Sequence, residues 1–392
     1  MMQLDKDLSG LLRPAALVLD GAMEFGLEVE FAHGNIVDIR PHTGLPEAFV
    51  LSPAFVNAHS HLEYRGLQGS LDSTEYMPWI RELVAAKMRQ GEIEVAADCL
   101  LAARENVAAG VGAIAEHSDR IGAASAMKTV GLTGYVFQEV VTFADQDRQA
   151  KLNEIAERMQ AQSADWPGIA ISPHAPHTVD EQTLEQWSRP EKLFSIHVGE
   201  TDAENEFFRF GTGPIAGLYA SLGVPVVARG ISVVEFLVQI GLANSLAQFV
   251  HGCSLTSDEI GMLAERGVRL AHCPRSNRAL NCPRAKVRQM LDAGMPVGLG
   301  LDSAASSGPI NMFSEMQATL RTARELGEPV SGDQVWQMAT TGGADSIDMP
   351  QWKIEVGAAP PLIAIQYAGE QTSEDLILAE PSLHWVTMPH AK

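Results

Sequence analysis

The chain has 392 residues, of which 46% are hydrophobic and 20% are charged, a balance typical of folded globular proteins rather than disordered ones. Its 28 basic and 49 acidic residues give a formal net charge of -21, which disfavours a nucleic-acid partner and an anionic membrane surface. No apolar stretch is long enough to span a bilayer, and the acidic N-terminus lacks the pattern of a signal peptide. Four widely spaced cysteines suit a reducing cytoplasm.

The two ends of the chain predict a small β domain. Residues 1–52 contain β-like runs at 16–19, 27–32 and 36–40, which are separated by glycine and proline turns. Residues 349–392 contain similar runs at 362–367 and 383–388. We expect these two ends to form one small β-sandwich domain.

The central part, residues 53–348, alternates short apolar runs with amphipathic helical stretches, which is the pattern of βα units around a parallel sheet. The strand candidates are 54–58, 112–116, 133–140, 168–172, 193–197, 248–251, 268–272 and 296–301. Helical segments are predicted at 77–90, 94–109, 147–160, 257–266 and 283–293. Eight units over about 290 residues predict an α/β fold of the (β/α)8 TIM-like barrel type. The long gaps at 62–111 and 201–247 are expected to carry a lid and substrate contacts.

Metal ligands are predicted at the strand ends of this barrel. His59 and His61 end the first strand, and their i, i+2 spacing places both imidazoles on one face. His197 ends the fifth strand and Asp302 follows the eighth, so all four meet at the face where barrel active sites form. Three nitrogens and one oxygen predict a mononuclear catalytic site with a position left for water. Zinc is expected, although iron and manganese suit the same ligands.

Two further residues have predicted catalytic roles. Glu200, three residues after His197, can reach the nucleophilic water or a ring nitrogen of the substrate, and we assign it as the proton shuttle. Its alternative role is that of a carboxylate at the start of a helix. His251 ends the sixth strand and is predicted to orient the nucleophile while Asp302 manages its proton. A buried histidine of the core is the alternative.

Substrate contacts are predicted in the loops after the strands. His174 follows the fourth strand between two prolines that stiffen its loop, and we assign it to substrate binding. Arg275 or Asn277, after the seventh strand, contacts the substrate or fixes the loop. Other histidines that either line the pocket or pack in the core are His117, His177 and His272. No lysine lies near the end of the fourth strand to bridge a second metal.

With these residues assigned, the chain resembles the deaminase and chlorohydrolase branch of the amidohydrolase superfamily over nearly its whole length. The shared features are a strand-1 HxH, a strand-5 HxxE, a strand-6 His and a strand-8 Asp, carried by His59, His61, His197, Glu200, His251 and Asp302. The resemblance implies hydrolytic deamination, in which an activated water attacks an amino-bearing ring carbon and Glu200 protonates the adjacent nitrogen. It also implies a homodimer.

Finer features look like the aminodeoxyfutalosine deaminase-like subgroup, namely Glu63 with Gly66 and Gly69, the Pro78-Trp79-Ile80 run and the segment 207–214. This likeness implies a purine nucleoside with a carboxyphenyl ketone, a place in menaquinone biosynthesis, and an arginine that meets the carboxylate. The candidate arginines are Arg65, Arg81, Arg120, Arg209 and Arg275. Leu301 and His177 depart from the usual pattern beside the pocket.

Two kinds of alternative function are also compatible with the sequence. The first keeps the fold and the metal but changes the substrate to guanine, adenosine, S-adenosylhomocysteine, a pterin or a triazine. The second is a non-catalytic binding protein built on a barrel.

Overall fold

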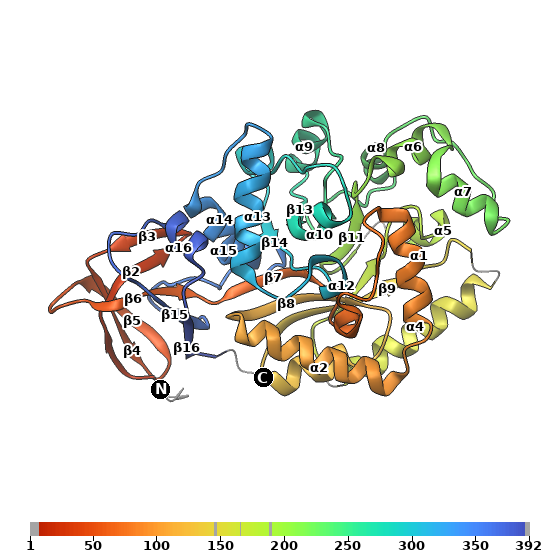
Figure 1. Cartoon of the computed structure of the whole chain (residues 1–392). Helices are drawn as coiled ribbons and strands as arrows, with labels where there is room; N and C mark the ends of the chain where they lie inside the picture. The colour runs from red at the N-terminus through yellow and green to blue at the C-terminus, as the bar shows by residue number, and fades with distance from the viewer. Residues whose placement is uncertain (1–7, 145–146, 165, 188–189, 389–392) are drawn as a thin grey trace.

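The computed structural model describes residues 8–144, 147–164, 166–187 and 190–388. Parallel strands form its centre in two four-stranded sheets, ordered β10-β9-β8-β7 and β11-β12-β13-β14 (Figure 1). Their bounds are β7 Phe55–Ser60, β8 Val111–Ser118, β9 Thr133–Val140, β10 Ile169–Pro173, β11 Phe194–Val198, β12 Ala247–His251, β13 Arg269–His272 and β14 Val297–Leu299. Each of the eight central runs predicted as a strand is therefore a strand.

The two sheets join at both edges. At one edge Ser60 forms a parallel bridge with Asp302, whose backbone N–H donates to the carbonyl oxygen of His59 at 2.9 Å. At the other edge the backbone N–H of His197 donates to the carbonyl oxygen of His174 at 2.9 Å. The strands thus close into an arrangement of the TIM-barrel type, and their carboxyl ends point to one face.

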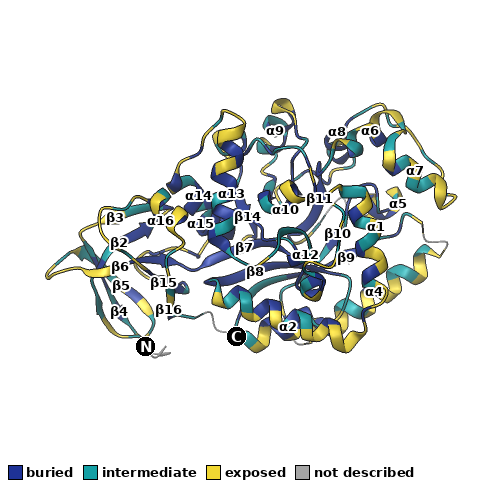
Figure 2. Cartoon of the chain, in the orientation of Figure 1, coloured by how far each residue is buried: buried dark blue, intermediate teal, exposed yellow. Residues whose placement is uncertain are grey.

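Helices cover the outside of these strands, which are buried, whereas the outward faces of the helices are exposed (Figure 2). In α2, for example, buried Val95, Cys99 and Ala102 follow the helical period. The helices are the 3-10 helix η1 Leu62–Leu67, α1 Tyr76–Lys87, α2 Glu92–Ala108, α3 Ala123–Val130, α4 Arg148–Ser163, α5 Glu181–Gln186, α6 Asp202–Phe210, α7 Gly213–Ser221, α8 Val233–Gln239, α9 Ser257–Ala264, α10 Pro274–Ala279, α11 Val287–Asp292, α12 Ala304–Ser307, α13 Met312–Glu325, α14 Gly332–Ala339, α15 Thr341–Ser346 and α16 Ser373–Ala379.

Strands from both ends of the chain share one five-stranded sheet, ordered β16-β15-β6-β2-β3, and lie side by side in Figure 1. A three-stranded sheet, β1-β4-β5, accompanies it. The bounds are β1 Gly10–Leu12, β2 Pro14–Leu19, β3 Ala22–Phe25, β4 Leu27–Ala32, β5 Asn35–Pro41, β6 Glu47–Pro53, β15 Leu362–Gln366 and β16 Leu383–Thr387. An apolar cluster separate from the barrel core includes Leu17 and Leu51 from the first sheet and Val29 and Ile36 from the second.

The two long gaps are helical. The first contains η1, α1 and α2, and the second contains α6, α7 and α8. Within the residues that the structure describes, no helix has both the length and the apolar character that crossing a membrane requires.

Candidate active site

His59 lies near the end of β7 and His61 directly follows that strand; both side chains are buried and their ring centroids are 4.9 Å apart. Both ring nitrogens of His59 and the Nδ1 of His61 lack a hydrogen-bond partner among the described residues. Buried polar atoms normally have partners, so unpartnered nitrogens on two adjacent buried rings indicate a site for a ligand. Neutral imidazole nitrogen is a preferred ligand of zinc.

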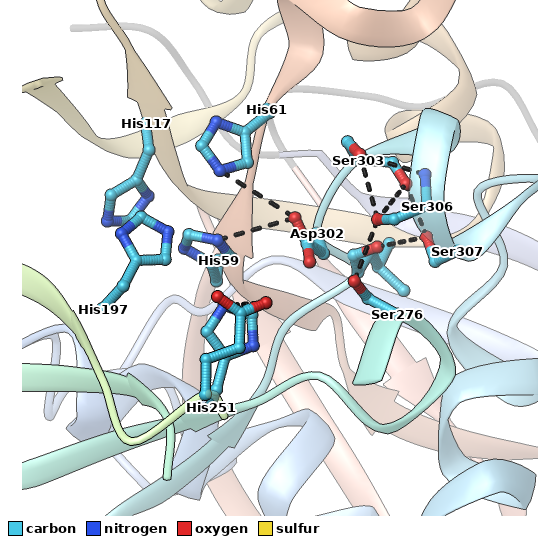
Figure 3. Close-up of polar contacts among 12 residues, drawn as sticks. His59, His61, His117, His197, His251, Ser276, Asp302, Ser303, Ser306 and Ser307 are labelled. Carbon is cyan, nitrogen blue, oxygen red and sulfur yellow. Dashed lines mark hydrogen bonds and ion pairs between the residues drawn. The ribbon is translucent and has the colours of Figure 1, made fainter. Parts of the chain in front are cut away.

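His197 and Asp302 face the same point as these two histidines (Figure 3). Ligand atoms of His59, His61 and His197 lie within 4.8 Å of one another, and so do those of His59, His251 and Asp302. Oδ1 of Asp302 is 3.7 Å from Nε2 of His59 and 3.9 Å from Nε2 of His61. A single ion with bonds of about 2 Å needs this convergence. The residues therefore fit one divalent cation.

Burial and hydrogen bonding keep the histidines in the form that binds metals. Nδ1 of His197 lies 2.6 Å from the carbonyl oxygen of His174, so its N–H donates there and the Nε2 lone pair faces the site. Burial, helped by the neighbouring His174 ring, lowers the pKa of His197 to about 3. Burial and adjacent imidazoles hold the pKa values of His59 and His61 well below the usual range. All three rings are neutral near pH 7, as coordination requires.

Asp302 is held by strained backbone and by serine hydroxyls. Its φ is 53°, in the left-handed region that residues other than glycine rarely adopt, and such strain clusters at functional sites. Burial raises the pKa of Asp302 to about 6, while hydrogen bonds from Ser276, Ser303 and Ser306 oppose the rise. The hydroxyls of Ser276 and Ser306 are 2.9 Å apart (Figure 3). A bound cation favours the ionised carboxylate.

Glu200 lies just beyond β11, with its Oε1 3.6 Å from Nε2 of His251. The carboxylate of Glu204, in the first turn of α6, accepts hydrogen bonds of 2.9 Å from the backbone N–H groups of Gly199 and Glu200. These bonds fix the backbone from which the Glu200 side chain projects. Glu204 thereby occupies the helix-start position that was the alternative role of Glu200.

The environment of Glu200 favours a protonated carboxyl group. Burial contributes most, and the charges of Asp302 and Glu204 add to it, so that the pKa of Glu200 is raised well above its usual range. A hydrogen bond from Tyr76 opposes the rise. A carboxyl group that keeps its proton near pH 7 can donate it to a substrate.

His251 shares the backbone feature of Asp302, with a φ of 74° at the end of β12. Its ring lies between two polar partners, since Nε2 faces Glu200 and Nδ1 lies 2.9 Å from Nδ2 of Asn277. Burial holds its pKa well below the usual range. His251 therefore presents a neutral ring to the centre of the site.

A cavity opens above these residues. Its lining is His61, Tyr64, Tyr76, Trp79, Ile80, Leu83, Glu139, His174, His197, Glu200, His251, Leu280, Asp302 and Ser303. The stretch from η1 to α1 contributes its aromatic and aliphatic wall, as expected of the first long gap. The second gap instead lines a separate hollow with Phe207, Phe208, Tyr219 and Phe236. His174 lines the cavity, whereas His117, His177 and His272 do not.

The five arginines named from the sequence lie outside the cavity lining, as far as the structure describes the chain. Arg65 is paired with Glu105 through two bonds of 2.5 and 2.7 Å. Arg209 is partly exposed, 3.7 Å from Glu235, and Arg275 donates to a backbone carbonyl at 2.9 Å. The structure therefore brings none of the five to the cavity lining.

Among the lining residues that the sequence analysis did not name are Glu139 and Tyr76. Glu139 belongs to the strand predicted at 133–140, and its alternation with Phe137 was the signal that could have placed it inside the barrel. Burial raises its pKa to about 8, although Lys87 opposes the rise. Tyr76 starts α1 and reaches Glu200 only because that helix folds over the barrel, which no local pattern reveals.

Comparisons with known proteins identify a family, similar sequences and similar folds. The model of the family described as "Amidohydrolase family" matches residues 50–386. The 5-methylthioadenosine/S-adenosylhomocysteine deaminase of Haloquadratum walsbyi is 32% identical over 336 residues, which are 81% of this chain and 71% of that protein. The crystal structure of Helicobacter pylori aminofutalosine deaminase with methylthio-coformycin has a TM-score of 0.79 at 19% identity, covering 94% and 95% of the two chains. A zinc-bound adenosine deaminase from Xanthomonas campestris has a TM-score of 0.76 at 23% identity, covering 94% and 88%. At these identities the two structures show a shared fold.

Proposed function

The chain belongs to the amidohydrolase family and is a metal-dependent hydrolytic enzyme, and from this premise we propose that it deaminates an adenine-type nucleoside. One observation carries the proposal: Glu200, a buried carboxyl group with a raised pKa, lines one cavity with Asp302 and with two of the proposed metal ligands, His61 and His197. A proton donor beside a hydrolytic centre suits the protonation of a ring nitrogen during loss of ammonia. The sequence similarity to a deaminase of adenine nucleosides supports the same class.

The proposed ligands of the metal are His59, His61, His197 and Asp302, and the proposed metal is zinc. When bound, such an ion supplies a water whose pKa is lowered to about 7, so that a strong nucleophile exists at neutral pH. The open nitrogens of His59 and the convergent geometry support this set.

The residues around the ligands have complementary proposed roles. Glu200 donates its proton to the ring nitrogen beside the amino-bearing carbon, which makes that carbon more electrophilic. His251 holds the attacking oxygen through its Nε2, and the carboxylate of Asp302 accepts the proton that this oxygen gives up. Asp302 then passes this proton to the amino group, which leaves the tetrahedral carbon as ammonia, and the remaining hydroxyl proton returns to Glu200 as the carbonyl forms.

The cavity lining bears on the choice among nucleosides. 5-methylthioadenosine and S-adenosylhomocysteine are supported by the activity for which the Haloquadratum walsbyi relative is named. Aminodeoxyfutalosine, with a place in menaquinone biosynthesis, is the second candidate and is supported by the subgroup motifs of the sequence. Its carboxylate needs a cationic partner, and no arginine is found among the described lining residues. 5-methylthioadenosine has no carboxylate, so we place it first, ahead of S-adenosylhomocysteine and aminodeoxyfutalosine, which both carry one.

The organisation of the chain is proposed from the same observations. Residues 53–348 form the catalytic barrel, and residues 1–52 and 349–392 together form a small β-sandwich domain beside it. The sheet shared by β6 and β15, and the apolar cluster between the two small sheets, support this division.

The test is ammonia release by a sample whose metal content is assayed in parallel. The panel contains 5-methylthioadenosine, S-adenosylhomocysteine, adenosine, aminodeoxyfutalosine, guanine, a pterin and a chlorinated triazine. Ammonia from an adenine nucleoside supports the proposal and ranks the candidates. Release of chloride from the triazine, or no release of ammonia from any compound by a fully zinc-loaded sample, contradicts it.

A further inference from the structure

Glu139 is a buried carboxyl group in the cavity that the proposed mechanism leaves without a role. In β9, Phe137 points into the barrel, where its ring stacks on His117 at 4.9 Å. Glu139 follows two residues later and therefore points to the same side, one layer nearer to the mouth. Its side chain is 4% exposed and lines the cavity. The Oε1 atom has no hydrogen-bond partner among the described residues.

The neighbouring residues of Glu139 are two histidines. A carboxylate oxygen of Glu139 and ring nitrogens of His174 and His197 lie within 4.8 Å of one another. Nδ1 of His174 is 2.9 Å from the hydroxyl oxygen of Thr178, so Nε2 is the nitrogen left for a ligand. Glu139 and His174 thus form a polar wall beside the proposed metal site.

Among the described residues, no cation forms a salt bridge with this carboxyl group. Lys87, whose charge acts on Glu139, is instead paired at 2.7 Å with Asp119 and lies 2.8 Å from the hydroxyl of Tyr64. A buried carboxyl group without a partner is costly, so its partner is expected to arrive with the ligand.

Two kinds of partner fit poorly. A second metal ion would have to take Nε2 of His197, which the first ion already needs, and Glu139 with His174 alone gives too few ligands. An anionic substrate group would find no cation among the described residues of this wall. Hydroxyl groups fit well, because a carboxyl group can exchange hydrogen bonds with two adjacent hydroxyls whether or not it holds a proton.

We infer that Glu139 and His174 form a hydroxyl-binding subsite that selects nucleosides with free 2′ and 3′ hydroxyls. The inference rests on the proposed function and adds the part of the substrate, the ribose diol, that this wall recognises. Glu139 is then a specificity-determining residue, which acts on binding rather than on the transfer of protons.

The test compares analogues on the zinc-loaded wild-type enzyme. We expect kcat/KM for 2′,3′-dideoxyadenosine to be about 10- to 100-fold below that for adenosine, because the missing hydroxyls leave a buried carboxyl group unpaired. Glu139→Ala is expected to lose most of the activity on adenosine, so that its kcat/KM values for the two nucleosides differ by no more than about threefold. This variant should still bind one zinc per chain. Glu94→Gln, on the exposed face of α2, is the matched control and is expected to keep the wild-type preference.

The outcomes separate the inference from the function on which it rests. Equal turnover of adenosine and 2′,3′-dideoxyadenosine by the wild type overturns the subsite and leaves the deaminase intact. A second zinc that is lost in Glu139→Ala also overturns it, in favour of a second metal site. Absence of ammonia from every adenine nucleoside overturns both. The wild-type comparison stands even if the variant fails to fold.

Discussion

Asn277 donates a hydrogen bond from its Nδ2 to Nδ1 of His251 over 2.9 Å. The donor occupies the lone pair of Nδ1, so the ring proton of the neutral imidazole is on Nε2, which lies 3.6 Å from Glu200. His251 can therefore donate a hydrogen bond to an oxygen in the centre of the site. The loop after β13 thus sets the tautomer of a residue on β12.

Reversing this hydrogen bond is expected to impair catalysis without loss of metal. Asn277→Asp keeps the shape but turns the donor into an acceptor, which moves the ring proton to Nδ1 and leaves Nε2 without one. We expect kcat to fall by about 100-fold or more, as when a catalytic histidine is held in the wrong tautomer. Ammonia release and zinc content measured together check this. Asn153→Asp, exposed on α4, is the control, and full activity of Asn277→Asp would refute the role.

Glu200→Gln removes the proposed proton donor while preserving its size. We expect kcat to fall by about 10²- to 10⁴-fold, the usual contribution of general acid–base catalysis, with unchanged zinc content. Steady-state kinetics with the best nucleoside measure the effect. Glu206→Gln, an exposed position on α6, should behave as wild type. Near-normal turnover by metal-loaded Glu200→Gln would exclude the assignment.

Removal of the metal is expected to abolish activity and to lower stability. Only the folded protein presents the assembled ligands, so zinc binds the folded state and not the unfolded one. Zinc at about 1,000 times its dissociation constant therefore adds about 4 kcal/mol to the free energy of unfolding. Thermal unfolding before and after dialysis against a chelator measures the difference, and added zinc should restore both properties. An apoprotein that retained full turnover would contradict metal dependence.

Gly300 allows β14 to approach β7 closely. A Cβ atom at this position would lie 2.7 Å from Sγ of Cys273 and 2.7 Å from Cβ of His59, closer than atoms can pack. We expect Gly300→Ala to displace His59, to weaken zinc binding by at least about tenfold and to lower stability by about 1–3 kcal/mol. Zinc titration and thermal unfolding measure the two effects.

Gly261→Ala on α9 is the matched control for this substitution, because its Cβ would meet no atom within 4 Å. Alanine in a helix is favoured over glycine by about 0.5–1 kcal/mol, so this variant should be as stable as wild type or more so. Wild-type zinc affinity in Gly300→Ala would show that β7 tolerates the added methyl group.

The stability of the two small sheets is expected to fall in acid. Glu28 is buried, and the backbone N–H of Thr43, followed by the hydroxyl of Thr43 and by Arg40 and Arg13, lowers its pKa from 4.5 to about 2. A lowered pKa in the folded state stabilises the protein above pH 4.5, and this contribution is lost as the pH falls through 2. Glu28→Gln should therefore lower the melting temperature at pH 7 and have little effect near pH 2.

Melting curves across this pH range measure the difference, with Glu30→Gln as the control. Glu30 also pairs with Arg40 but is half exposed, so its loss should change stability little at either pH. A pH-independent effect of Glu28→Gln would show that lost packing, rather than charge, is responsible.

The sequence by itself determined the order of the elements and the core of the proposed site. Strands and helices were predictable because apolar periodicity is a local property of the chain. The convergence of His59, His61, His197 and Asp302, the proposed ligands, was predictable because parallel strands of a barrel end on one face, so a position in a strand also gives a position in space. The spacing of Glu200 from His197 placed it in the same way.

Only the tertiary structure decided what surrounds that core. Arg65 has its carboxylate partner forty residues away in sequence, and that pairing removes it from the pocket. Asn277 meets His251, and Tyr76 meets Glu200, across elements whose relative position no local pattern fixes. Glu139 has the sequence signature of an ordinary strand residue, but the packing of the barrel leaves its Oε1 buried without a hydrogen-bond partner among the described residues. Side-chain partners depend on the packing of distant segments, whereas the strand ends depend on local periodicity.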